Sequence, residues 1–165
     1  MKIAAILAIV FIVGCKASTS PNGTTSTEGS MTATVNGSAW STIGLPGAQT
    51  ARATRDTSSG TVTVTGLNAN LENLTNPSSI TLILLRPSVG TVTLGTTGNE
   101  GIFAYGTVPK DGYISTSGSV SITKFDTVNR LISGNFNFTG TQILDTISKS
   151  VTVTNGSFLD VEWSK

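Results

Sequence analysis

The chain has no histidine, one cysteine, and charged side chains at only 12% of its positions. Without histidine it lacks the commonest general base at neutral pH, so Ser-His-Asp triads, histidine-containing zinc sites and imidazole pH switches are excluded. A single cysteine also excludes an intrachain disulfide. The basic residues are scattered singly between acids, unlike the basic patch of a nucleic-acid binder. The composition leaves catalysis to carboxylates and predicts no cofactor and no nucleic-acid partner.

The cysteine closes an N-terminal segment with the features of a bacterial lipoprotein export signal. Lys2 provides a positive charge, and Ile3–Val13 is an uninterrupted apolar run. A transmembrane anchor would need roughly 20 apolar residues, so this run is too short for one; an ordinary secretory signal is the other alternative. We expect residues 1–14 to be a signal peptide cut before a lipidated cysteine, because the end of the run resembles a lipobox: Ile12, Val13, Gly14 and Cys15.

Residues 15–30 hold no large apolar group and predict a flexible Ser/Thr-rich tether. Such a chain has a root-mean-square span of about 20 Å, so the domain would work near its membrane. Removal of Lys2 with the signal would leave nine basic and nine acidic side chains, a net charge of zero. We expect a lipid-anchored protein of the cell envelope, in the outer membrane, on either its periplasmic or its outer face.

Residues 31–165 predict one all-β domain. Short Val/Ile/Thr runs alternate with Gly, Asn and Ser, which is typical of an antiparallel β-sandwich of nine or ten strands or, as the alternative, of a partly open β-barrel. Alternation places one face of each strand in the core and the other in water. The clearest strands are 61–66, 80–86, 90–94, 101–108, 119–125, 131–139 and 150–163.

Two segments support more detailed predictions. Ile80–Leu85 is almost continuously apolar, which predicts a central strand covered on both faces. Residues 150–163 predict a hairpin with a Thr154–Gly156 loop. In that hairpin Val151, Val153, Leu159, Val161 and Trp163 would face inward, and Thr152, Asp160 and Glu162 outward.

Two other turns and one tryptophan also follow from the alternation. Residues 126–130 predict the turn of the preceding hairpin, whose inward residues would be Val120, Ile122, Ile132, Phe136 and Phe138. Asn36-Gly37 predicts a two-residue turn that places Trp40 on the packed face.

Several blocks together resemble an uncharacterised lipoprotein family that is typical of Bacteroidota and is classified as a domain of unknown function. They are Thr32–Trp40 (TATVNGSAW), Ser117–Asp126 (SGSVSITKFD), Ile132–Phe138 (ISGNFNF) and Val153–Phe158 (VTNGSF). The resemblance spans essentially the whole predicted domain. It implies location and fold, and it carries no catalytic or binding residue.

The carboxylates give two weak chemical hypotheses. Asp160 and Glu162 are two positions apart on one predicted strand, so they could form the acid and base pair of a glycan hydrolase, although a solvated strand face is the plainer interpretation. Asp126 with Thr127 and Asn129 could contribute to a calcium loop, but an Asp in a hairpin turn more often caps its own backbone. We therefore predict no metal site.

Aromatic rings give the best binding hypothesis. Tyr105 and Tyr113 lie in a segment rich in Gly and Pro, where flat rings could stack on sugars while neighbouring polar groups bind the hydroxyls; a tyrosine with its ring in the core is the alternative. Thr127 and Thr146 each follow an Asp and precede an apolar residue, which resembles the O-glycosylation acceptor sequence of Bacteroidota.

The sequence therefore predicts a non-enzymatic binding or interaction module for a glycan or an envelope protein. A carboxylate-dependent glycan hydrolase and a structural subunit of an envelope assembly are the alternatives. Exposed edge strands would favour the structural subunit.

Overall fold

The computed structural model describes residues 18–19, 25–26, 29–43, 50–70, 73–95, 98–106, 112–143 and 149–164. These residues form strands and their connections without a helix, which confirms the predicted all-β class. In these ranges no helix is long and apolar enough to cross a lipid bilayer. The strands are β1 (Ser18–Thr19), β2 (Thr25–Ser26), β3 (Ser30–Val35), β4 (Ser38–Ser41), β5 (Ala51–Arg55), β6 (Thr61–Asn70), β7 (Asn73–Leu85), β8 (Gly90–Thr93), β9 (Glu100–Tyr105), β10 (Gly112–Asp126), β11 (Leu131–Gln142) and β12 (Ser150–Ser164).

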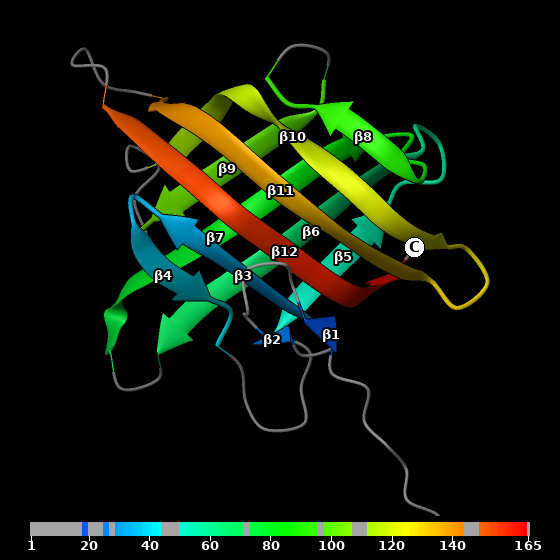
Figure 1. The fold of residues 1–165 in the computed structure, drawn as a ribbon, viewed down its shortest axis with the longest axis horizontal. Helices are drawn as coiled ribbons and strands as arrows, with labels where there is room; N and C mark the ends of the chain where they lie inside the picture. Colours follow the sequence, from blue (N-terminus) through cyan, green and yellow to red (C-terminus); the bar gives the residue numbers. More distant parts are fainter. Residues whose placement is uncertain are drawn as a thin grey trace, which may run out of the picture.

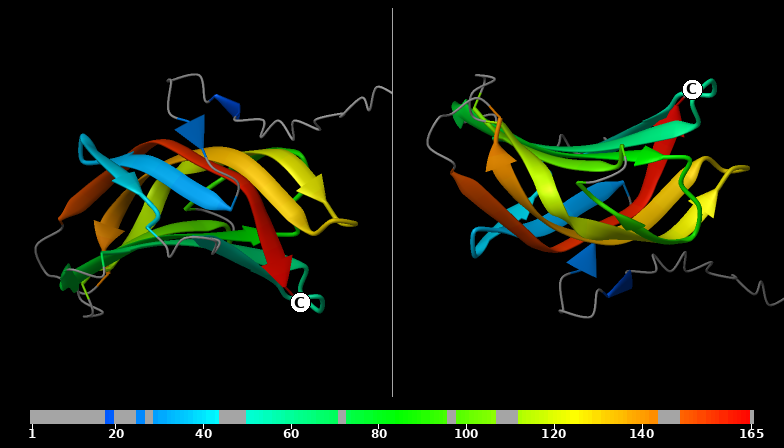
Figure 2. Two further views of the ribbon diagram at one scale, coloured as in Figure 1. Left: turned by 90° about the horizontal axis from the view of Figure 1, so that it is seen from below. Right: turned by 90° about the horizontal axis from the view of Figure 1, so that it is seen from above.

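Seven strands close into a barrel (Figure 1). Their order is β11, β10, β9, β7, β6, β5 and β12, and β12 pairs back onto β11. Neighbours are antiparallel except β12 and β5, which run parallel where Trp163 lies opposite Ala53. β3 and β4 extend the sheet from β12, and β8 pairs with β10. The structure matches the barrel alternative, and the predicted sandwich is not confirmed. Figure 2 shows the ring flattened into two layers, which is why strand alternation alone fits both folds.

β12 is one continuous strand, so the predicted hairpin over 150–163 is wrong. Asn155 and Asp160 have positive φ angles of 51° and 45° and lie beside shifts in the register. Each shift adds a residue and resets which side chains face inward. The buried series is therefore Val151, Val153, Gly156, Phe158, Val161 and Trp163, whereas Leu159 is only half-buried.

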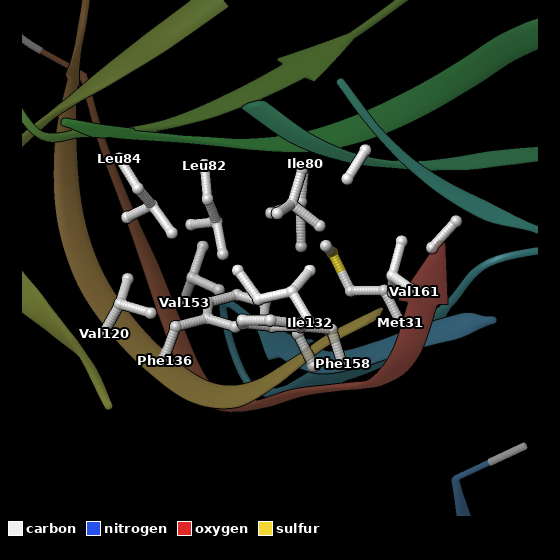
Figure 3. Packing of buried hydrophobic residues seen from close by; sticks show 14 of the residues in the cluster. Met31, Ile80, Leu82, Leu84, Val120, Ile132, Phe136, Val153, Phe158 and Val161 are labelled. Carbon is white, nitrogen blue, oxygen red and sulfur yellow. The ribbon is translucent and has the colours of Figure 1, made fainter. Parts of the chain in front are cut away.

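The barrel interior is filled by apolar side chains (Figure 3). Ile80, Leu82 and Leu84 of β7 point toward Phe136 of β11 and Phe158 of β12, and all five are fully or almost fully buried. On the outer face of β7, Ile83 is half-buried and Leu85 is exposed. The predicted burial of this strand on both faces is therefore wrong.

Two phenylalanines fill the centre because glycines lie opposite them. Phe136 pairs with Gly156 and Phe158 pairs with Gly134 across β11 and β12, and the two ring centroids are 6.2 Å apart. A Cβ at Gly156 would lie 2.5 Å from the Phe136 ring, and one at Gly134 would lie 2.8 Å from the Phe158 ring. The missing side chains therefore let both rings lie over the neighbouring strand.

The other detailed predictions are confirmed. Strands β10 and β11 meet at a turn over residues 127–130, with Val120, Ile122, Ile132, Phe136 and Phe138 buried. Trp40 packs in the core, and its indole Nε1 donates a 2.9 Å hydrogen bond to the Ser78 hydroxyl. Trp163 is also a core residue, 3% exposed, and its ring stacks on Phe125.

Gly29 fastens the N-terminal end of the domain to the barrel. Its N–H donates to the Leu159 carbonyl at 2.7 Å, and its carbonyl accepts from Ala51 N at 2.8 Å and Thr50 N at 3.0 Å. It thus joins β12 to the start of β5. Within the predicted tether, β1 and β2 form a separate two-stranded antiparallel ladder. The predicted signal peptide, its lipobox and Cys15 lie outside the described residues.

Candidate functional site

A hollow of about 410 Å³ opens on the outer face of β3, β4 and β12. Ala33 and Trp40 lie opposite each other with buried side chains, so their backbone forms the floor. The flanking pairs, Thr32 with Ser41 and Thr34 with Ala39, project from the other face of the strands. The complete lining is Thr32, Ala33, Thr34, Ala39, Trp40, Ser41 and Asn155. No ionisable side chain is among them.

Three hydroxyl groups of the hollow have no partner within the described part of the chain. They belong to Thr32, Thr34 and Ser41. Some hydroxyls elsewhere in the domain are engaged, for example those of Thr42 with Thr50 at 2.7 Å and of Thr65 with Thr81 at 3.2 Å. Each hydroxyl can donate one hydrogen bond and accept two. The hollow therefore offers neutral donors and acceptors to a ligand.

Local sequence explains how this hairpin is held. Asn36 and Gly37 have φ angles of 48° and 82°, the left-handed conformations that a tight two-residue hairpin turn requires. The Asn36 side-chain oxygen accepts a 2.9 Å hydrogen bond from Thr152 N, which fixes the turn to β12. Trp40 then anchors β4 through Ser78. The frame of the hollow is thus held at both ends.

The two tyrosines of the binding hypothesis lie elsewhere, near the ends of β9 and β10. Tyr105 is opposite Ser78 and is 48% exposed. Tyr113 is opposite Phe103, partly buried, with 6.2 Å between the two ring centroids. One ring thus offers an open face, and the other belongs largely to the core.

Asp160 is held by hydrogen bonds to neighbouring strands. Its Oδ1 atom accepts hydrogen bonds of 2.9 Å from both Lys124 Nζ and Ser133 Oγ, and its backbone N–H donates to Ser133 Oγ at 2.8 Å. These contacts hold the bulge at which Asp160 adopts its positive φ. Glu162, the other member of the predicted pair, is exposed on the same strand.

Asp126 caps its own turn, as predicted. Its Oδ1 atom accepts from Val128 N at 2.9 Å and Asn129 N at 2.8 Å, and its Oδ2 atom accepts from Asn129 Nδ2 at 2.7 Å. The bonds from Asn129 chiefly lower the pKa of this carboxyl. Thr127 is exposed in the same turn, and Thr146 lies outside the described residues. Among the residues that are described, no three His, Cys, Asp or Glu side chains are grouped to hold a metal ion.

Sequence reasoning missed an arginine inside the barrel wall. The guanidinium carbon of Arg55 lies 5.1 Å from the ring centroid of Trp163 and 5.6 Å from that of Phe125. Its Nε atom is buried and has no hydrogen-bond partner among the residues that the structure describes. The sequence signal for this position was the alternation over Ala51–Arg55, because Arg55 falls on the same face of the strand as the small residues Ala51 and Ala53. Its role there is to cover two aromatic rings by cation–π contact.

Acid should weaken the turn between β5 and β6. Hydrogen bonds from the Ser58 and Ser59 side chains to Asp56 lower the pKa of that carboxyl from 3.8 to about 2. Because the folded pKa is the lower one, the stabilisation is complete above pH 4 and is lost as the pH falls toward 2. We expect the Asp56→Asn protein to lose less stability than wild type between pH 5 and pH 2, measured by denaturant unfolding. Parallel pH curves would contradict this.

The fold and the hollow define an all-β barrel module with a filled interior and an uncharged polar hollow on its outer surface. The chain belongs to the family described as Domain of unknown function (DUF6252), whose model matches residues 27–162. The predicted membership of a family of unknown function is thereby confirmed. No curated protein and no solved structure matches the chain.

Proposed function

We propose that the protein is a lipid-anchored component of the cell envelope, in the outer membrane, whose barrel is a non-enzymatic module that binds a glycan or another envelope protein. The lipobox-like residues before Cys15 support the anchor, and the resemblance to a Bacteroidota lipoprotein family supports the location. Gly29 fixes the point at which the tether joins the barrel. The module would therefore meet its partner close to the membrane.

The location of the hollow is the observation that supports the binding proposal. Small barrels either hold a ligand inside or fill the interior with side chains, and here Phe136, Phe158 and Leu82 fill it. The hollow on β3, β4 and β12 is on the outside and has a volume typical of ligand sites, which span about 300–1,000 Å³. This arrangement supports binding at the outer surface and argues against carrying a ligand within the barrel.

The contacts of Asp160 favour binding over hydrolysis. The general acid of a glycosidase needs a carboxyl free to give up a proton to the leaving group, whereas Asp160 is paired with Lys124 and Ser133. The structural-subunit alternative rests on β4, which is the last strand in the order of its sheet. An end strand can accept a strand from another protein, which supports an envelope protein as the second type of partner.

The proposal predicts that a ligand stabilises the folded barrel. We would measure thermal unfolding of the full-length chain in mild detergent against neutral oligosaccharides, acidic oligosaccharides, calcium and peptidoglycan fragments. A ligand that binds only the folded state increases the unfolding free energy, by about 2.7 kcal/mol at a hundredfold excess over Kd, and so raises the unfolding temperature as its concentration rises. A rise with one glycan class would support the module. No rise with any of them would contradict glycan binding and leave the protein partner, which crosslinking in cells would identify.

A further inference from the structure

We infer that the hollow on β3, β4 and β12 is a binding site for a neutral saccharide. This rests on the proposed function, to which it adds the location of the site and the chemistry of the ligand. Tyr105 and Tyr113, the platform predicted from the sequence, lie outside this lining.

The charge of the lining selects the ligand class. Arg, Lys, Asp and Glu are absent from the seven lining residues. A phosphate, a carboxylate or an amine would lose water there without gaining an opposite charge, which is unfavourable. An uncharged ligand with many hydroxyl groups suffers no such loss.

The arrangement of hydroxyls matches that ligand. Thr32 and Thr34 are two residues apart on β3, a spacing of roughly 7 Å, and Ser41 lies beside Thr32 on β4, at roughly 5 Å between Cβ atoms. The three hydroxyls therefore cover an area on the scale of one sugar ring. Each can donate and accept, which suits sugar hydroxyls that do both.

The hydroxyls of the hollow lie on a rigid frame, which favours ligand binding. Trp40 fastens the floor to β7 through the buried bond to Ser78, and Asn36 fastens the hairpin turn to β12. Groups that are already fixed lose little conformational entropy when a ligand binds. Asn155 forms the β12 side of the hollow and is held in a left-handed bulge.

The test uses variants that change the hollow and leave the core alone. Thr34→Val keeps the shape of the side chain and removes its hydroxyl, and Ser41→Ala does the same on β4. Ala39→Phe fills the hollow from an exposed position. The matched control is Thr54→Val, an exposed threonine of β5 outside the hollow. Tyr105→Ala reports on the alternative platform.

Binding would be measured by calorimetry with the full-length chain in mild detergent. The probes are neutral hexasaccharides of glucose, mannose, xylose and N-acetylglucosamine, with oligogalacturonate as the acidic comparison. We expect one neutral probe to bind and the acidic one not to bind. Thr34→Val and Ser41→Ala should each weaken binding about three- to tenfold, and Ala39→Phe should abolish it. Thr54→Val and Tyr105→Ala should bind as wild type does.

The possible failures are distinct. If wild type binds only the acidic probe, this inference is overturned while glycan binding stands, and if it binds none of the probes, both fail together. If wild type binds and all three hollow variants bind equally well, the inference is overturned while the proposed function stands, and a loss in Tyr105→Ala would place the ligand on the tyrosine. A second arm compares the free sugar with the same sugar carried on a lipid in micelles of the same detergent, with the sugar-free lipid in those micelles as the blank. Stronger binding to the lipid-linked sugar would identify a glycolipid as the source.

Discussion

Replacing Phe136 with alanine should cost the barrel about 3–5 kcal/mol of its unfolding free energy. The ring is 3% exposed and lies over Gly156, which has no side chain to fill the space left behind. The centroid of the neighbouring Phe158 ring is 6.2 Å away, and that ring lies over Gly134. Because neither neighbour can collapse into the cavity, we expect a value at the upper end of that range. Domains of this size are stable by about 5–15 kcal/mol, so the loss should be plain in denaturant unfolding.

The partnership with Gly156 can be tested by adding a methyl group. Gly156→Ala alone should destabilise by about 1–3 kcal/mol, because its Cβ would lie 2.5–2.6 Å from three atoms of the Phe136 ring. In the double variant the methyl enters the space that the ring has left, so the combined loss should be smaller than the sum. Thr152→Ala, exposed on the same strand, is the control and should stay within about 0.5 kcal/mol of wild type. Strict additivity would show that the ring and the glycine do not depend on each other.

The strands from Thr61 to Gln142 were predictable because each depends on its own alternation. The period of two holds for the buried residues on either side of this turn, Val120 and Ile122 in β10 and Ile132, Phe136 and Phe138 in β11, and the Asp126 turn supplies its own hydrogen bonds. Local chemistry sufficed there. How many faces of a strand are covered depends on elements elsewhere in the chain and not on the strand's own residues. For this reason the apolar run of β7 predicted cover on both faces, although Leu85 is exposed.

The dipeptide Asn-Gly shows where local chemistry stops being sufficient. At 36–37 it forms the tight turn that its sequence favours, with positive φ at both residues. At 155–156 only Asn155 has a positive φ, and the chain continues as β12 with a bulge. The difference lies in what faces the dipeptide, since Gly156 lies under the Phe136 ring and β12 pairs with strands on both edges. Those contacts come from residues far away in the sequence.

The same limit explains the site. Alternation predicts that Thr32 and Thr34 face outward, but it does not predict a hollow, which depends on how β4 and the bulge at Asn155 are placed. Barrel closure also depends on a distant contact, the parallel pairing of Trp163 with Ala53. Tyr105 and Tyr113 were predicted as binding residues because aromatic residues can be recognised in a sequence, whereas a concave group of hydroxyls can be recognised only in the folded structure.

Replacing Cys15 with serine should abolish fatty-acid incorporation completely. The lipobox-like segment places this residue where a lipoprotein peptidase would cut, and serine lacks the thiol that receives the lipid. One acyl chain gives only marginal membrane binding, and stable anchoring needs a second signal, so we expect wild type to carry more than one chain. Growth of the native host with an alkyne fatty acid, followed by gel fluorescence, would report the label.

The control for this experiment is Lys16→Ala, which leaves the cysteine in place and should keep the label. Intact mass should show wild type beginning at residue 15 with its lipid, and the Cys15→Ser chain still carrying residues 1–14, because the lipoprotein peptidase requires the modified cysteine.

The same spectra test O-glycosylation at Thr127 and Thr146, since a mass equal to the lipidated polypeptide alone would end that proposal. Persistent label in the Cys15→Ser chain would place the lipid elsewhere, and an unlabelled wild type would remove the anchor from the proposed function. Neither result would change the description of the barrel and its hollow, because both lie within residues 29–164 and neither includes the lipid.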